Sequence, residues 1–391
     1  MALVQTTPKS IKIWTTDISK VYLWENLVRP PYKPRTFTIT RTEKSDMSSW
    51  WTYSDDAAWL TAGDGAFDDF FWYSAVLLNT SGVETAEMKQ SWWVFTGAMT
   101  TLGNITSGDN VMIKFPVRWI KMAKSWSTVT LSITEELGKD GYQYYAFQQW
   151  QTNNITATKD KFYMWTYMWT TDNNKLKSWS WQQPIRSYTQ ANYITYAGNN
   201  GTWYTIEWFY QRMYIDALYM MKYWNPNHRT TVWYGYSYRS SSAWTATTWW
   251  TDNQTNATYG NTSSTSIQAK LFWLEDRWWS RWEFIWWAYL WTNKVLYTQL
   301  SGYSWTTSWW VTTNATINGA NSYISTIAWT NKAMFAPIAT VSSRSYYTDE
   351  TVANAADRLI YTWDYYRGLF WLYPMQTTET HNNGWVRLMY L

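Results

Sequence analysis

The sequence contains no cysteine and only two histidines, His228 and His381. The absence of cysteine excludes disulfides, thiolate catalysis and zinc–sulfur sites, and two histidines are too few for a multi-histidine metal centre. Charged residues make up only 15% of the 391 residues, and the net charge of +4 is spread without a run. We therefore expect no nucleic-acid partner, which would need a concentrated Lys and Arg face.

Long apolar runs are also missing. No apolar stretch approaches the roughly 20 residues that a membrane-spanning helix needs. The first residues, Met1–Pro8, have no charged segment leading into an apolar run, as a signal peptide would. We therefore expect neither membrane insertion nor a signal peptide.

Glycine is scarce and tryptophan is abundant, with 16 Gly against 36 Trp, whereas glycine averages about 7% of residues. Trp126 falls between two alternating segments, Lys114–Lys121 and Ser127–Thr134, where a tight turn favours glycine. Trp224 follows a predicted helix, Tyr204–Tyr223, at the position of a glycine cap. We hypothesise that many tryptophans, with Trp179 among them, are glycines in the natural protein, because some bacteria decode UGA as glycine and others as tryptophan. The alternative is a truly tryptophan-rich binding surface.

Two segments of the last third carry motifs. Residues 271–284 read LFWLEDRWWSRWEF, and the chain ends GWVRLMYL. They resemble the L-[FY]-G-[LI]-E-D-x-x-G-N-x-W-E-[WF] segment and the G-x-R-L-x-[YF]-L ending of the formylglycine-generating-enzyme-type C-type lectin fold. Trp273 and Trp279 stand at glycines of that pattern. The resemblance implies an α+β fold, a C-type lectin-like domain with long loops in which the first segment supplies central strands and the ending closes the sheet.

The beginning of the chain carries a weaker motif. Lys20–Pro30 resembles a short strand near the start of many bacteriophage tail and fibre proteins, with Trp24 at a glycine, and Pro30, Pro31 and Pro34 suggest a stiff connector. We therefore divide the chain into an N-terminal strand and connector (1–35), a small β-rich module (36–110) and the lectin-like domain (111–391).

Further elements are expected from residue patterns. They are a helix at 64–71, a first hairpin within 111–134, an irregular segment at 230–263, and strands at 73–78, 162–167, 332–337 and 359–361. Asp64, Asp68 and Asp69 are interpreted as a solvated helix face rather than a metal site.

The resemblance carries no enzyme function to this chain. Formylglycine-generating enzymes use cysteine ligands and copper, and sugar-binding C-type lectins use calcium tripeptide motifs; this sequence has neither. We therefore expect no catalytic residue, no metal and no cofactor. The residues that match the family pattern are expected to be structural, with the charged ones forming buried hydrogen bonds or ion pairs that hold loops to the final strands: Glu275, Asp276, Trp278, Trp282, Glu283 and Arg387.

A polar and aromatic stretch before the final strand is the predicted ligand-binding surface. Many of its residue types arise when adenines change in AAY codons, as in the lectin-fold proteins varied by diversity-generating retroelements. Tyr offers contact area at low entropic cost, and Asn and Thr offer adaptable hydrogen bonds; the alternative is a loop that happens to be polar. The predicted ligand-binding residues are Asp364, Tyr365, Tyr366, Tyr373, Gln376, Thr377, Thr378, Glu379, Thr380, His381, Asn382 and Asn383.

These features together indicate a phage or prophage tail-fibre adhesin located in the virion. Its expected partners are a host cell-surface protein or glycan and other phage tail proteins, and the resemblance implies a possible homotrimer. The alternatives are a structural tail or baseplate subunit that uses the fold for assembly, and an adhesin on the surface of a bacterial cell.

Overall fold

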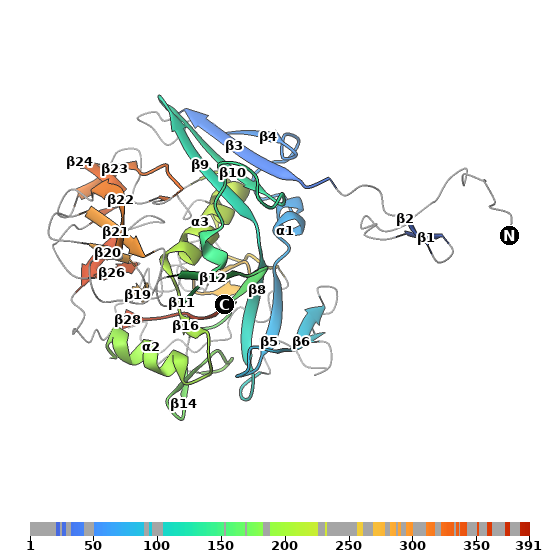
Figure 1. The fold of residues 1–391 in the computed structure, drawn as a ribbon, viewed down its shortest axis with the longest axis vertical. Helices are drawn as coiled ribbons and strands as arrows, with labels where there is room; N and C mark the ends of the chain where they lie inside the picture. The colour runs from blue at the N-terminus through green and yellow to red at the C-terminus, as the bar shows by residue number, and fades with distance from the viewer. Residues whose placement is uncertain are drawn as a thin grey trace.

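The computed structural model describes the chain in segments separated by gaps. They are residues 21–23, 26–28, 33–42, 51–89, 94–95, 105–151, 154–168, 170–182, 188–225, 231–232, 256–260, 269–277, 282–286, 288–290, 295–299, 310–316, 322–331, 334–335, 337–341, 350–351, 358–361, 372–375 and 384–391. Many short strands and few helices make up these segments (Figure 1), in agreement with the expected α+β class. Within them, no helix has the length and apolarity to cross a membrane.

A seven-stranded antiparallel sheet forms the centre of the fold. Its last strand in the chain, β29 (Leu388–Tyr390), lies between β13 and β16, so the C-terminal end of the chain is an inner strand rather than an edge. Alternate residues of β8 enter two separate cores: Ile113 packs into one and Met112 into the other. The sheet is therefore buried on both faces. Its strand order is β16 (Tyr204–Ile206), β29, β13 (Lys161–Trp165), β8 (Asn110–Pro116), β5 (Ser74–Leu78), β6 (Glu84–Lys89) and β7 (Val94–Phe95).

A four-stranded sheet joins the beginning of the described chain to its middle. Its order is β4 (Thr52–Asp55), β3 (Thr36–Thr42), β10 (Thr128–Thr134) and β9 (Trp119–Ser125). Because β3 pairs with β10 and β5 pairs with β8, both sheets run across the predicted boundary at residue 110. Residues 36–110 and the segment that follows them therefore share their sheets and a common core.

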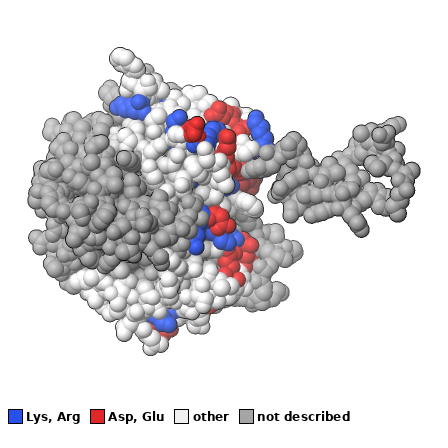
Figure 2. Space-filling model, viewed as in Figure 1, with Lys and Arg blue, Asp and Glu red and all other residues white. Residues whose placement is uncertain are grey.

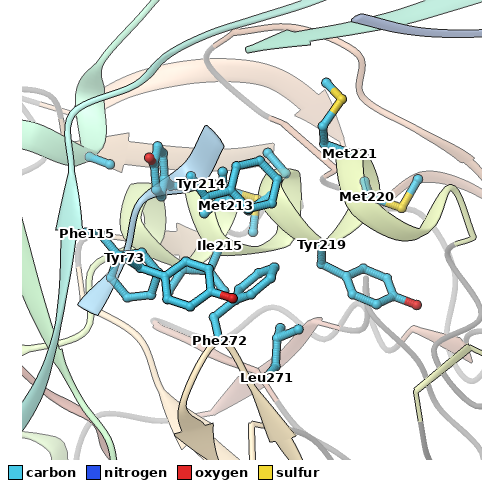
Figure 3. Close-up of a cluster of buried hydrophobic side chains, with 14 of the residues drawn as sticks. Tyr73, Phe115, Met213, Tyr214, Ile215, Tyr219, Met220, Met221, Leu271 and Phe272 are labelled. Carbon is cyan, nitrogen blue, oxygen red and sulfur yellow. The ribbon is translucent and has the colours of Figure 1, made fainter. Parts of the chain in front are cut away.

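Helix α3 (Phe209–Tyr223) crosses the centre of the fold and is buried from Phe209 to Lys222. Figure 3 shows the helix above Leu271 and Phe272, with Phe115 near one end of it and Met220 and Met221 near the other. The ring of Tyr214 meets that of Phe147 edge-on, with centroids 5.0 Å apart, a favourable aromatic geometry. A helix that is apolar nearly all round is typical of an element enclosed by its neighbours.

The predicted start of this helix at Tyr204 is wrong, whereas its end at Tyr223 is confirmed. Residues Tyr204–Ile206 instead form β16 and pair with the final strand. Aromatic and β-branched residues favour strands, and the chain turns into the helix only after Trp208, whose backbone is extended and whose N–H donates to Gln211 Oε1 (3.1 Å).

The remaining helices are short. Helix α1 (Ala66–Phe71) confirms the predicted helix but begins two residues later. Helix α2 (Gln190–Gly198) was not expected from the sequence; the Asn192 N–H donates to Thr189 Oγ1 (3.2 Å), which is a helix cap. A turn of 3₁₀ helix spans Tyr145–Phe147.

The other strands form small sheets, and one predicted strand is displaced. The strand expected at 332–337 is β24 (Pro337–Val341), whereas β26 (Arg358–Tyr361) agrees with the strand expected at 359–361. A hairpin of β1 (Val21–Leu23) and β2 (Asn26–Val28) stands apart from the main body in Figure 1. The others are β11 (Gln148–Gln151), β12 (Asn154–Thr158), β14 (Thr170–Asp172), β15 (Lys175–Lys177), β17 (Lys270–Leu271), β18 (Leu274–Glu275), β19 (Trp282–Phe284), β20 (Ala288–Leu290), β21 (Val295–Gln299), β22 (Trp310–Thr316), β23 (Ser322–Ile327), β25 (Glu350–Thr351), β27 (Leu372–Met375) and β28 (Gly384–Trp385).

Candidate functional site

The predicted ligand-binding stretch is bracketed by strands of one sheet. Strand β26 precedes it, β27 lies within it, and β28 follows it; the sheet order is β27-β26-β19-β28. Of the predicted residues only Tyr373 falls in a described element, where its backbone pairs with that of Ile360. The others lie outside the described residues: Asp364, Tyr365, Tyr366, Gln376, Thr377, Thr378, Glu379, Thr380, His381, Asn382 and Asn383.

The two motif segments meet in this sheet, but only in part. Strand β19 runs parallel to β28, so that Trp282 pairs with Gly384 and Glu283 with Trp385. Residues Leu271–Glu275, which were also expected to supply a central strand, form a separate hairpin of β17 and β18. That expectation is therefore wrong, because Phe272 and Trp273 adopt positive φ (50° and 68°) and reverse the chain after Leu271.

Glu283 is the centre of a buried cluster of charges behind the sheet. Its Oε1 accepts a hydrogen bond from Arg387 Nε (2.7 Å), and its Oε2 accepts one from Arg212 Nη1 (2.7 Å). Arg277 Nη1 approaches the same Oε2 at 3.8 Å. All four side chains are at most 3% exposed. One carboxylate thus holds together helix α3, the segment after β18 and the C-terminal end of the chain.

Two further carboxylates complete the cluster. Arg277 Nη1 donates to Glu207 Oε1 (2.7 Å), and Arg212 Nε donates to Asp216 Oδ2 (3.3 Å). Both carboxylates are fully buried. In their ionised forms the three arginines and three carboxylates balance one another, as buried charges require.

The predicted core residues contribute to this region in different ways. Arg387 Nη2 donates to the carbonyl of Glu275 (2.7 Å), the N–H of Glu275 donates to the carbonyl of Thr166 (2.7 Å), and the N–H of Asp276 donates to the carbonyl of Ala269 (2.7 Å). Glu283 and Arg387 form the ion pair, Trp282 lies in β19, and Trp278 falls outside the described residues. The structure therefore brings Glu275, Glu283 and Arg387 together.

The other members of the cluster were missed by the sequence analysis. Arg212 and Asp216 are four residues apart in the predicted helix, a spacing that places them on one helix face. Charges inside an otherwise apolar helix were a signal for a buried pair. Nothing in the sequence pattern connects Glu207 and Arg277, which are 70 residues apart.

The cluster shifts the acidity of its carboxyls in opposite directions. Burial alone would raise the pKa of Glu283, but Arg387, Arg212 and Arg277 together hold it below its ordinary value. Burial raises the pKa of Asp216 to about 6, because the loss of solvation outweighs the attraction of Arg212 and Arg277. A perturbed pKa marks a candidate site only where a substrate has access. These side chains are enclosed, so their arrangement is suited to holding the fold together.

An open cavity of about 500 Å³ lies elsewhere, between α1 and the end of α3. Its Asp68 carboxylate already accepts hydrogen bonds from Lys222 Nζ (2.6 and 2.7 Å) and from the Tyr73 hydroxyl (2.7 Å). The charges of Asp68 and Lys222 therefore neutralise each other within the protein. The cavity is lined by Gly63, Gly65, Asp68, Asp69, Tyr73, Lys222, Tyr223, Asn256, Ala257, Thr258 and Trp273.

The expected acidic helix face at Asp64, Asp68 and Asp69 is partly engaged in the fold. Asp68 pairs with Lys222, and Asp64 Oδ1 accepts a hydrogen bond from the N–H of Ala66 (2.9 Å). Among the described residues, no group of three or more His, Asp or Glu side chains is placed to hold a metal ion.

Charge on the described surface is mixed in sign. Figure 2 shows basic and acidic side chains side by side on this face rather than a patch of one sign. The bridges of Lys114 Nζ to Glu84 (3.1 Å) and Glu87 (2.8 Å) are examples. Comparison with known proteins adds no relative, because no protein-family model and no curated protein matches the sequence.

The Glu283 carboxylate generates a stability prediction. We expect Glu283→Gln to lower the free energy of unfolding by about 3–5 kcal/mol, because it leaves Arg387 and Arg212 buried without their shared charge. Urea-induced unfolding measures the loss. The matched control is Glu136→Gln, which removes a half-exposed partner of Lys139 (3.1 Å) and is expected to cost less than about 1 kcal/mol. Equal losses in the two variants would contradict the assignment.

The raised pKa of Asp216 generates a pH prediction. Its pKa rises from 3.8 to about 6 in the folded protein, so Asp216 favours the folded state below pH about 4 and loses that contribution as the pH rises to about 6. The stability of Asp216→Asn relative to the parent is therefore expected to increase over this window, by up to about 3 kcal/mol, and to level off above it.

Urea unfolding at pH steps between about 3 and 7 measures this difference. Glu283→Gln provides the contrast, because a lowered pKa makes its relative stability change below pH about 4.5 and in the opposite direction. A difference between Asp216→Asn and the parent that stays constant from pH 4 to 6 would show that Asp216 titrates normally.

Proposed function

We propose that this chain is a non-catalytic ligand-binding protein of the phage or prophage tail-fibre type, with a C-type lectin-like domain. Tyr373 and the segments 364–366 and 376–383 make the binding surface, which a retroelement diversifies. The observation that supports this most is the sheet β27-β26-β19-β28, whose strands precede, interrupt and follow these segments. Loops that vary in sequence need strands that keep their positions, and this sheet would provide them.

The ion pair between Glu283 and Arg387 holds this sheet in position. Glu283 lies in β19, the strand that pairs with both β26 and β28, and its partner Arg387 lies between β28 and β29. Arg387 connects the small sheet to the central sheet, where β29 is an inner strand. Loops carried on a rigid scaffold are where binding residues concentrate.

The composition of the surface supports recognition rather than chemistry. Tyrosines offer rigid contact area, and the Asn, Thr and Gln side chains offer donors and acceptors without a fixed charge. The buried ionisable cluster is closed to a substrate. We propose a host surface protein or glycan as the ligand, with other tail proteins and further copies of the chain as assembly partners.

The test replaces the two segments while keeping the strand between them. Residues 364–366 and 376–383 are exchanged for Gly and Ser, and β27 is left intact because it pairs with β26. We expect loss of binding to a glycan array and to intact bacterial cells, with an unchanged melting temperature. A structural tail or baseplate subunit would instead keep its assembly contacts and show no surface binding in either form.

A matched control exchanges Glu136–Gly138, an exposed turn far along the chain from the proposed surface, and is expected to leave binding unchanged. Binding that survives the exchange of 364–366 and 376–383 would refute the site. A reverse-transcriptase gene with a template repeat that differs from this segment at adenines would support diversification, and tail genes without them would favour the structural tail or baseplate subunit.

A further inference from the structure

Left-handed backbone conformations in this chain are occupied by an unusual residue. Among the described residues, twelve non-glycine residues have positive φ, and six of them are tryptophan. Tryptophan thus occupies as many positive-φ positions as glycine does. The six are Trp72 (54°), Trp126 (56°), Trp181 (60°), Trp203 (76°), Trp224 (61°) and Trp273 (68°).

The chemistry of the side chain makes this pattern costly. In the left-handed region the Cβ atom approaches the following carbonyl oxygen, which disfavours every residue that has a Cβ. Asn and Asp tolerate the region because their short side chains bond locally, and they account for four of the twelve positions. An indole offers no such compensation.

The turn at Trp126 shows the requirement most directly. Strands β9 and β10 are joined by two residues, since Ser125 pairs with Thr128. Trp126 has positive φ and Ser127 does not, which is the pattern of a type II′ turn with glycine at its first central position. The Trp126 side chain is 96% exposed, so no burial offsets the strain.

Two helix ends repeat the requirement. Trp224 ends α3 in the left-handed conformation (φ 61°, ψ 0°), and its N–H donates to the carbonyl of Met220 (2.9 Å). Trp72 ends α1 in the same way (φ 54°, ψ 37°), and its N–H donates to the carbonyl of Asp68 (2.8 Å). Glycine is the usual residue at this position of a helix. Trp72 is 70% exposed.

The hairpin of β17 and β18 gives a different turn with the same outcome. Leu271 pairs with Leu274, so Phe272 and Trp273 form a two-residue loop in which both φ are positive. This is the type I′ pattern, which favours Asn-Gly or Asp-Gly and places glycine second. Trp273 stands at that second position.

The other described tryptophans have an ordinary φ and are not part of the pattern. Trp165 lies in β13, is fully buried and has an ordinary φ. Trp179, which the sequence hypothesis included, donates from its indole Nε1 to the carbonyl of Asp109 (3.2 Å) and also has an ordinary φ. The backbone therefore separates one group of tryptophans from another.

We propose that residues 72, 126, 181, 203, 224 and 273 are glycine in the natural protein, specified by UGA codons that its own cell decodes as glycine. The positive φ angles at these six positions support the assignment to glycine, and the overall tryptophan content does not enter the argument. It follows that the protein is made where a glycine-inserting tRNA reads UGA. If the proposed tail-fibre function also holds, its ligand is displayed by a bacterium that uses this code.

Reading the six codons in the gene tests the proposal independently of folding and of the proposed function. We expect UGA at all six positions and UGG at Trp165. UGG at Trp126, Trp224 or Trp273 would overturn the assignment, because these three turns define it.

A stability measurement supplies the second test. The variant with the three exposed substitutions Trp72→Gly, Trp126→Gly and Trp181→Gly, whose side chains are 70%, 96% and 52% exposed, is expected to melt about 5 °C above the parent chain, because no core packing is lost. The matched control is Trp59→Gly, because Trp59 is 72% exposed but has an ordinary φ; it is expected to leave the melting temperature unchanged or lower it. A triple variant that melts no higher than the parent, or a control that gains as much as Trp126→Gly alone, would overturn the proposal.

Discussion

The structure depends on the charge of Glu283 being matched where no water reaches it. A buried carboxylate is tolerated only when cations and hydrogen bonds replace its hydration, and here Arg387 and Arg212 each approach it at 2.7 Å. These residues come from β19, the C-terminal segment and helix α3, so the pairing is complete only when three distant parts of the chain are in place. An arrangement that misplaces any one of these three segments leaves a buried charge unpaired, so the cluster disfavours alternative folds in addition to any stabilisation it gives.

The same buried ion pairs hold the small sheet β27-β26-β19-β28 in position. Arg387 also donates to the carbonyl of Glu275, which fixes the β17–β18 hairpin beside helix α3. The residues after Arg387 continue directly into β29 at the interior of the seven-stranded sheet. Movement of the small sheet would separate buried charges, which is costly. The strands β26 and β28, which flank residues 362–383, are therefore held in place independently of the sequence between them.

How far the sequence predicted this arrangement depends on the range of each signal. The turn at Trp126 and the helix end at Trp224 were correctly located, because capping and turn chemistry act within a few residues. Tyr204–Ile206 was mistaken for helix because its strand partner is the end of the chain, and Arg277 was not connected to Glu207 because ion pairs leave no periodic trace. The Leu271–Glu275 hairpin was misjudged since Phe272-Trp273 carries no recognisable turn residue. The predicted ligand-binding residues rest on composition and position alone.

Two kinds of information are thus separable in this chain. Backbone geometry marks positions where glycine is favoured and the side chain gains no burial, as at Trp72 and Trp126, and these belong to a helix end and a turn. Residue chemistry marks the proposed binding positions Asp364–Tyr366 and Gln376–Asn383, where hydroxyls, amides and phenol rings follow one another in the sequence. A codon read differently alters the first kind, because it places a Cβ where the backbone excludes one. It leaves the second kind intact, since Asn, Tyr, Thr, Asp and His do not arise from UGA. Both observations agree with the proposal of a binding surface of variable sequence on a scaffold held together by buried ion pairs.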